Sequence, residues 1–108
     1  MKKRSKGASS RKAWTELSKD IRRRIPYCQK CGRKADEARL QVHHILPRRL
    51  YPKLLLDRSL LLVLCPRCHN FCRGSAHKDG VAFAVWLERA FPDVWKRLRD
   101  YLDESSNL

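Results

Sequence analysis

The sequence has no apolar run of the roughly 18 residues that a membrane span needs. Its start, Met1 to Arg4, leads into serine, glycine and more lysine rather than into the apolar stretch of a signal peptide. We therefore expect the protein to stay in a reducing cytoplasm. In that compartment, the five cysteines indicate a metal site rather than disulfides.

Acidic residues are also scarce, since 11 Asp and Glu stand against 25 Lys and Arg and leave a formal net charge of +14. A positive charge of this size favours a polyanionic partner, and nucleic acid is the commonest one for a small protein. A ribosomal or merely solubilised basic protein is the alternative. The length of 108 residues predicts one domain with a modest core.

The first part of the chain is basic and then helical. Residues 1–10 have almost nothing to bury, which predicts a disordered basic arm. Ser9 or Ser10 is the expected N-cap of a helix at residues 13–25, where apolar residues recur at helical spacing until Pro26.

Two strands are predicted in the middle of the chain. Residues 40–43 alternate apolar and polar, and residues 60–64 form a continuous apolar run. Pairing as a hairpin is the simplest arrangement, with a proline-punctuated basic loop at residues 47–53 between the strands.

The remaining sequence predicts helices at residues 81–90 and 92–102, with a short helix after Cys68. The three tryptophans each lie in a helical apolar stripe, so we interpret them as core rather than as stacking platforms. The side chains expected to face inward in the last two helices are Val81, Phe83, Ala84, Trp86, Leu87, Val94, Trp95, Leu98, Tyr101 and Leu102.

Two paired-cysteine knuckles give the strongest pattern. Cys28 and Cys31 form one C-x2-C pair, and Cys65 and Cys68 form another with the same spacing. Four thiolates at this spacing can surround one zinc tetrahedrally at roughly 2.3 Å. This predicts a structural Zn²⁺ site, with iron or a redox pair as alternatives. Cys72 is left over and is interpreted as a spare buried thiol.

Histidines lie between and after the knuckles. His43 and His44 are adjacent, and a strand would place them on opposite faces, so both cannot be ordinary core residues. We expect one to face a metal or solvent and the other a substrate. His69 directly follows the second knuckle and can reach across to one of them. A second, catalytic metal site is therefore predicted.

The order of these motifs resembles the HNH endonucleases with the zinc-knuckled ββα-metal fold. The matching motifs are C-x2-C, then Val-His-His-Ile-x-Pro at residues 42–47, an apolar strand, and Leu-Cys-x-x-Cys-His at residues 64–69. The resemblance covers residues 28–72 closely. It implies an α+β fold in which a small zinc-stabilised ββα-metal core, a β-hairpin plus a helix, is flanked by an N-terminal helix and C-terminal helices.

The expected organisation is a single HNH-type nuclease domain at residues 11–104, with C-terminal helices within residues 81–102 and a tail at residues 105–108. The resemblance implies a metal-dependent DNA endonuclease that hydrolyses phosphodiester bonds by nicking or by double-strand cleavage.

The family's roles fall on matching histidines. His44 resembles the general base that takes a proton from the attacking water. His43 and His69 resemble ligands of one catalytic divalent metal, which is Mg²⁺, Mn²⁺, Ni²⁺ or Zn²⁺. The third ligand is open among His77, Asn70 and Asp57.

Position 60 departs from the family, because Leu60 stands where an Asn steadies the loop beside the base. Asp57 or Ser59 could substitute. The alternative function is a catalytically silent zinc-containing nucleic-acid-binding module, which has no use for the adjacent histidines. A zinc deaminase is excluded because no His-x-Glu occurs around His43 or His44.

Two clusters of basic residues are candidates for contacts with DNA phosphates, which position a duplex without reading its sequence. Either a monomer or a homodimer is compatible with the sequence. The candidate DNA-binding residues are Arg22, Arg23, Arg24, Arg48 and Arg49.

Overall fold

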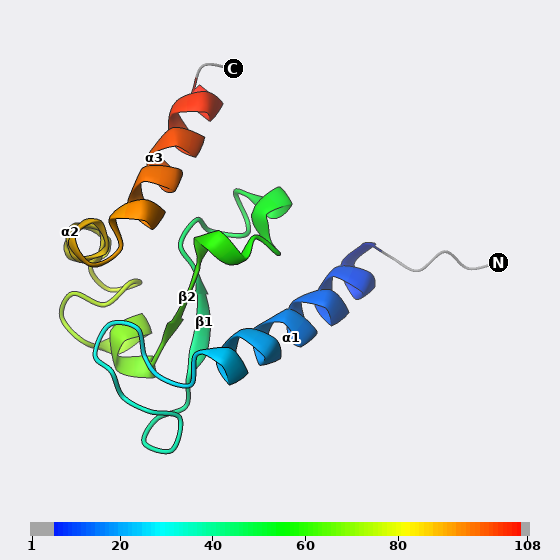
Figure 1. Ribbon diagram of the computed structural model, residues 1–108. Helices are drawn as coiled ribbons and strands as arrows, with labels where there is room; N and C mark the ends of the chain where they lie inside the picture. Colours follow the sequence, from blue (N-terminus) through cyan, green and yellow to red (C-terminus); the bar gives the residue numbers. More distant parts are fainter. Residues whose placement is uncertain (1–5, 107–108) are drawn as a thin grey trace. The chain divides into compact units, whose positions relative to one another are not determined.

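The computed structural model describes residues 6–106. The chain divides into two compact units, Met1–Pro66 and Arg67–Leu108. None of the helices within residues 6–106 is long and apolar enough to cross a membrane. The helices and strands, in chain order, are α1 (Lys6–Arg24), β1 (Gln41–His44), β2 (Leu61–Leu64), α2 (Gly80–Ala90) and α3 (Pro92–Ser106) (Figure 1).

The predicted hairpin is confirmed. Strands β1 and β2 pair antiparallel, with Gln41 opposite Leu64 and His44 opposite Leu61. Every residue of β2 is buried, as its continuous apolar run indicated. Each strand begins one residue later than expected, and in the case of β2 this is because Leu60 closes a short 3-10 turn at Arg58–Leu60.

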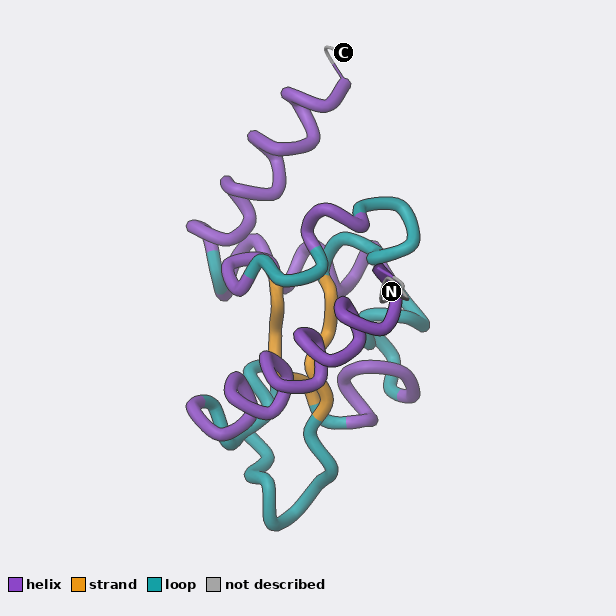
Figure 2. Tube along the Cα trace, turned by 90° about the vertical axis from the view of Figure 1, so that its right-hand side faces the viewer, coloured by secondary structure: helices purple, strands orange, loops and turns teal. Residues whose placement is uncertain are grey.

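Helix α1 belongs to the first unit and lies across the hairpin, as Figure 2 shows. Its inward stripe contains Ile21, which is buried, and the half-buried Trp14 and Leu17. Ile25 N–H donates to Ile21 O at 2.8 Å in the last helical turn, before Pro26 removes the next donor.

The start of α1 differs from the expectation. The helix begins at Lys6, ahead of Ser9 and Ser10, so residues 6–10 of the expected arm are helical. Ala8, Arg11 and Lys12 are good helix formers, which explains the extension. Residues 1–5 of the expected arm lie outside the described residues.

In the second unit, α2 and α3 pack against each other. Asp79 caps α2, since its Oδ1 accepts a hydrogen bond from Ala82 N–H at 3.0 Å. Phe83 and Leu87 are buried as predicted, and the Trp86 ring lies 5.2 Å from the Phe83 ring and 5.8 Å from the Phe91 ring. The interpretation of Trp86 as a packing residue therefore agrees with the structure.

Two of the expected core positions were wrong. Val81 is 78% exposed and Leu102 is 39% exposed. Val81 lies in the first turn of α2, one turn before the exposed Val85, so both are on the helix face away from Phe83 and Leu87. On α3, Leu98 is buried and takes the position that faces the core.

The first cysteine knuckle is attached to the free edge of β2 through Gln29. Gln29 N–H donates to Val63 O at 2.8 Å, and Gln29 Oε1 accepts from Val63 N–H at 2.8 Å. Val63 has 0% exposure, so water cannot take the place of the Gln29 side chain as the hydrogen-bond partner of the Val63 N–H. Gln29 therefore completes the hydrogen bonding of a buried strand and fixes the knuckle beside it.

We predict that Gln29→Ala lowers the free energy of unfolding by about 1 to 3 kcal/mol, because the Val63 N–H loses its partner in a buried position. Urea unfolding of zinc-loaded protein, followed by circular dichroism, measures the change. The control is Arg39→Ala at an exposed position, which should leave stability almost unchanged. Equal midpoints for Gln29→Ala and wild type would contradict this role of Gln29.

Candidate metal and nucleic-acid site

The first knuckle is a tight turn built by backbone hydrogen bonds. Cys28 N–H donates to Arg33 O at 2.7 Å, and Gly32 N–H donates to Cys28 O at 2.9 Å. Gly32 has φ of +82°, a left-handed conformation that glycine adopts without a steric penalty. Cys31 N–H points at Cys28 Sγ, 3.5 Å away, so the turn directs both thiols to one side.

Cys28, Cys31 and Cys65 lie together in the first unit as a cluster that could hold a metal ion, and Cys68, three residues after Cys65 in the sequence, is the fourth thiol of this set. Within the first unit, Cys31 Sγ and Cys65 Sγ are 3.6 Å apart. Two thiolates on one tetrahedral zinc, each at about 2.3 Å from it, would be about 3.8 Å apart. The donor set and its spacing thus fit one structural zinc.

The local environment favours the thiolate form of Cys28. Burial raises the pKa of this thiol, but the backbone N–H groups of Cys31, Cys65 and Lys30 point at the sulfur and together have the larger effect. The pKa falls to about 7. A thiol of this kind loses its proton readily to a metal. Cys72 is not in the cluster and is half-buried, with Arg67 Nε 3.3 Å from its sulfur.

His44 is held in one orientation by the backbone. Its Nε2 lies 3.1 Å from Leu55 O. A carbonyl oxygen can only accept a hydrogen bond, so Nε2 carries the proton and the Nδ1 of the neutral ring keeps its lone pair. The Trp14 ring lies against the imidazole, with ring centroids 4.3 Å apart and planes inclined by 37°.

The pKa of His44 is lowered from its ordinary value. Burial is the main cause, the hydrogen bond to Leu55 O opposes it, and the positive charge of Arg48 lowers the pKa further. The ring is therefore neutral at pH 7, which is the form that can accept a proton.

The loop that carries Leu55 is fixed by Asp57. Asp57 Oδ1 accepts from Ser59 N–H at 3.0 Å and from Ser59 Oγ–H at 2.5 Å. Leu60 N–H donates to Asp57 O at 3.1 Å, and Leu60 O accepts from Ile45 N–H at 3.1 Å. The Leu60 side chain is buried and contributes apolar packing. Asp57 and Ser59 thus form the polar links of this loop, as the sequence allowed.

His69 and His77 meet in the second unit. His69 lies in a π-helical turn at Arg67–Phe71, and His77 N–H donates to His69 O at 3.0 Å. Their Nε2 atoms are 2.9 Å apart, and two imidazoles on one tetrahedral zinc would place these atoms about 3.3 to 3.4 Å apart, so a shift of about half an ångström would let both bind one ion. Burial, and then the positive charge of His77, lowers the pKa of His69 to about 4.

The other two candidates for a third ligand have different surroundings. Asp57 is already engaged with Ser59, and Asn70 is half-buried in the turn that carries His69. His77, which lies against His69, is the candidate best placed to share an ion with it.

The arginines at the end of α1 are partly neutralised by Asp20. Arg23, Arg24 and Arg58 approach its carboxylate at 2.5, 3.0 and 2.6 Å. Arg58 and then Arg23 hold the pKa of Asp20 well below its usual range. Arg22 donates from Nε to a backbone carbonyl of its own helix. The Arg58 contact also links α1 to the loop before β2.

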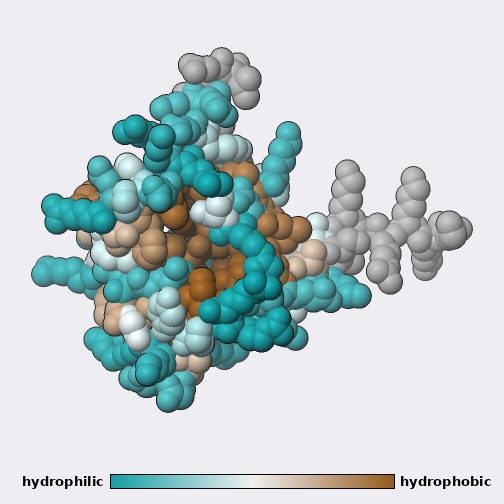
Figure 3. Space-filling view, viewed as in Figure 1, coloured by the Kyte–Doolittle hydropathy of each residue, from teal (hydrophilic) through white to brown (hydrophobic). Residues whose placement is uncertain are grey.

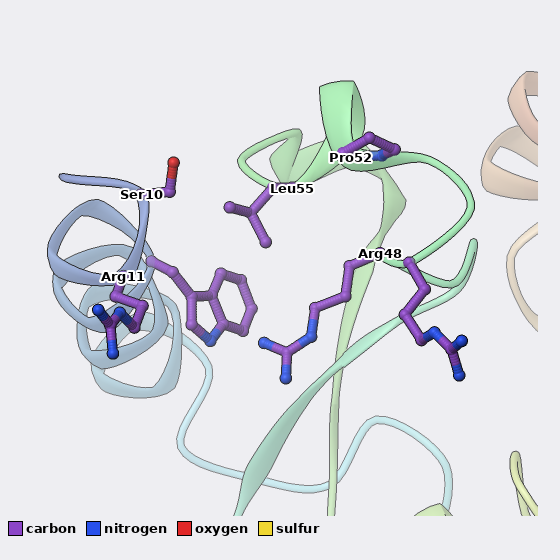
Figure 4. Close-up of a pocket in the computed structure, with 7 residues that line it drawn as sticks. Ser10, Arg11, Arg48, Pro52 and Leu55 are labelled. Carbon is purple, nitrogen blue, oxygen red and sulfur yellow. The ribbon is translucent and has the colours of Figure 1, made fainter. Parts of the chain in front are cut away.

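A cavity of about 350 Å³ opens between α1 and the loop after β1. Figure 4 shows Arg48 extending from the loop toward α1. The cavity is lined by Ser10, Arg11, Trp14, Arg48, Arg49, Pro52 and Leu55. Figure 3 shows hydrophilic residues around the edge of the visible face and a hydrophobic area at its centre.

Sequence reasoning missed two parts of this region. The carbonyl of Leu55 has no side-chain signature, so nothing in the sequence pointed to it. Trp14 was interpreted as core only, whereas it lines the cavity and contacts His44. One sequence feature could have indicated this role of Trp14: Arg11 and Trp14 are one helical turn apart and share a face of α1.

The model of the HNH endonuclease family matches residues 28–71. The resemblance inferred from the motifs is therefore confirmed for this segment, which contains both knuckles and the three histidines at positions 43, 44 and 69. The match points to nuclease or other nucleic-acid chemistry. It does not extend over α1, α2 or α3. No curated protein and no solved structure matches the chain.

We predict that the purified protein carries one zinc per chain and that chelation abolishes its cooperative unfolding, because apparent binding energies of roughly 10 to 16 kcal/mol exceed the stability of a small domain. Metal analysis and thermal denaturation measure both effects. Cys65→Ser should behave like chelated protein, whereas Cys72→Ser outside the cluster should keep its zinc. A folded wild type without zinc or iron would overturn the structural metal site.

Proposed function

We propose that this protein is a metal-dependent DNA endonuclease that hydrolyses phosphodiester bonds with His44 as general base. The observation that carries the proposal is the imidazole of His44, which is neutral and fixed through Nε2 to Leu55 O, so that Nδ1 is the proton-accepting atom. The family match over residues 28–71 supports the same reaction class.

In this reaction His44 Nδ1 takes a proton from a water molecule as that water attacks phosphorus. The ring must keep its direction while it gains positive charge, and Leu55 O stabilises the imidazolium through the Nε2–H. Trp14 covers part of the ring and limits its rotation. Arg48 and Arg49 line the adjacent cavity and are suited to bind the phosphates on either side of the scissile bond.

We further propose that His43, His69 and His77 hold the catalytic divalent ion. The Nε2 atoms of His69 and His77, both in the second unit, are close to the spacing of two ligands on one ion, and the family resemblance gives His43 the same role. When bound, the ion polarises the phosphate and stabilises the leaving 3′ oxygen. Imidazole ligands favour Mn²⁺, Ni²⁺ or Zn²⁺ over Mg²⁺, and availability decides among them.

A catalytically silent zinc module that only binds nucleic acid is the second candidate, and Leu60 is the observation that favours it. Such a module needs the positive charge and the cysteine cluster but no oriented base. The hydrogen bonds of Asp57 and Ser59 weaken this alternative, because they supply the loop support that Leu60 lacks.

We predict that His44→Ala lowers the rate of plasmid cleavage by roughly 10²-fold to 10⁴-fold, the usual contribution of a positioned general base. Zinc content, circular dichroism and DNA affinity should stay at wild-type values. His69→Ala is the matched control. Loss of the His69 imidazole should weaken binding of the catalytic ion, so activity should return in part as the metal concentration rises. Equal nicking by wild type and His44→Ala with every ion tried would leave the silent module as the function.

Asp57→Ala should lower the cleavage rate by up to about 10²-fold, because the loop that carries Leu55 O is no longer fixed and His44 loses its direction. Asp57→Asn keeps an acceptor for Ser59 and should retain most of the activity. Leu60→Asn should lower stability by about 1 to 3 kcal/mol without raising activity, since it buries an amide. A rate increase in Leu60→Asn would show that Asp57 does not fulfil the role of the missing Asn.

A further inference from the structure

The cavity beside His44 combines two kinds of wall. Its lining residues include three arginines and no acidic residue, and its apolar part consists of an indole, a proline and a leucine side chain. Cationic groups at an apolar, aromatic surface suit a ligand that has both a flat apolar face and a negative charge. A nucleotide has these two properties.

The size of the cavity limits what can enter. About 350 Å³ lies near the lower end of the roughly 300 to 1,000 Å³ of pockets that hold small molecules. A base within a duplex is stacked on both faces and paired along its edge, so it cannot place a face on Trp14. A base that has left the stack can do so.

The position of the cavity relates it to the reaction. The Trp14 ring that lines it also contacts the His44 ring, with centroids 4.3 Å apart. Leu55 also lines the cavity, and its carbonyl oxygen lies 3.1 Å from His44 Nε2. A nucleotide bound here is therefore held next to the proposed base. Ser10, Arg11 and Trp14 lie outside the segment that the family model matches, so this wall is an addition of α1.

We propose that the cavity binds one unpaired nucleotide of the DNA substrate, with its base against Trp14 and its phosphate at Arg48 and Arg49. The inference rests on the proposed action on DNA and narrows it: the preferred substrate has an extrahelical or single-stranded nucleotide beside the scissile phosphate. Paired DNA binds through phosphate contacts alone and leaves the cavity without a base.

Binding is tested with zinc-loaded protein and no added divalent ion, so that DNA is not cut. Fluorescence anisotropy compares a paired duplex, the same duplex with one unpaired nucleotide, the same duplex with an unpaired abasic residue, and the single strand. Stacking of one base on an aromatic side chain corresponds to roughly 5-fold to 150-fold in affinity. Wild type should prefer the unpaired nucleotide over the paired duplex by a factor in this range, and the abasic duplex should lose most of the preference.

The variants separate stacking from charge. Trp14→Ala should lose the preference and keep the affinity for paired duplex, while Trp14→Phe should retain part of the preference. Arg49→Gln should weaken binding of every DNA, and Arg39→Gln, at an exposed position outside the cavity lining, should weaken it less. A wild type that binds the four DNAs equally, or a folded Trp14→Ala that keeps the preference, overturns the proposal.

A second measurement does not depend on whether Trp14→Ala folds. The unpaired nucleotide is replaced by 2-aminopurine, whose fluorescence falls when the base stacks. Binding of the wild-type protein should quench the 2-aminopurine fluorescence. Unchanged fluorescence when the DNA is saturated with protein would overturn the proposal. Comparing the duplex with the single strand shows which source of unpaired nucleotide is preferred. Failure of the nuclease function would look different, because the binding preference would persist while no DNA is cleaved with any ion.

Discussion

A hairpin of two four-residue strands is too small to be stable in water by itself, and the first unit is organised around this constraint. One edge of β2 pairs with β1, and the other is closed by Gln29, which satisfies both backbone groups of Val63. Helix α1 lies across the hairpin. The thiols of Cys31 and Cys65 lie 3.6 Å apart at the end of β2, so an ion bound by both would join the knuckle to the strand. The strands are therefore held by contacts with other segments, and binding of such an ion would be coupled to folding.

The same hairpin positions the histidines of the proposed reaction. Because side chains alternate along β1, His43 and His44 are neighbours in sequence but face opposite sides. His43 is buried on one side, and His44 on the other meets Leu55 O and Trp14. Two consecutive residues of one strand thus provide the proposed metal ligand on one side of the hairpin and the proposed general base on the other. The loop between the strands folds back so that Leu55 O orients the His44 imidazole. A change in the hydrogen bonds within this loop would therefore alter the orientation of the imidazole indirectly.

The cysteine pairs, the hairpin and the adjacent histidines could be predicted because each depends on local spacing or periodicity. The burial of Val81 was predicted incorrectly, because the apolar residues of α2 extend around more of its circumference than the neighbouring helix covers, and Val81 lies with the exposed Val85 on the face away from Phe83 and Leu87. The contact of His44 with Leu55 O could not be predicted, since it depends on a backbone group 11 residues away. The double role of Trp14 was missed for a similar reason: periodicity assigns a side chain to the inner face but cannot tell a filled core from an open cavity.

Helix α1 connects the stability of the hairpin with the proposed choice of substrate. Its Asp20 binds Arg58 at 2.6 Å, which ties the helix to the short turn that follows Asp57. One turn and a half toward the N-terminus, Trp14 lines the cavity and contacts His44. The helix that braces the hairpin is thus also the wall against which a base would stack. A change in the packing of α1 on the hairpin would alter the support of His44 and the shape of the cavity together, so the proposed catalysis and the proposed selection for an unpaired nucleotide depend on the same packing.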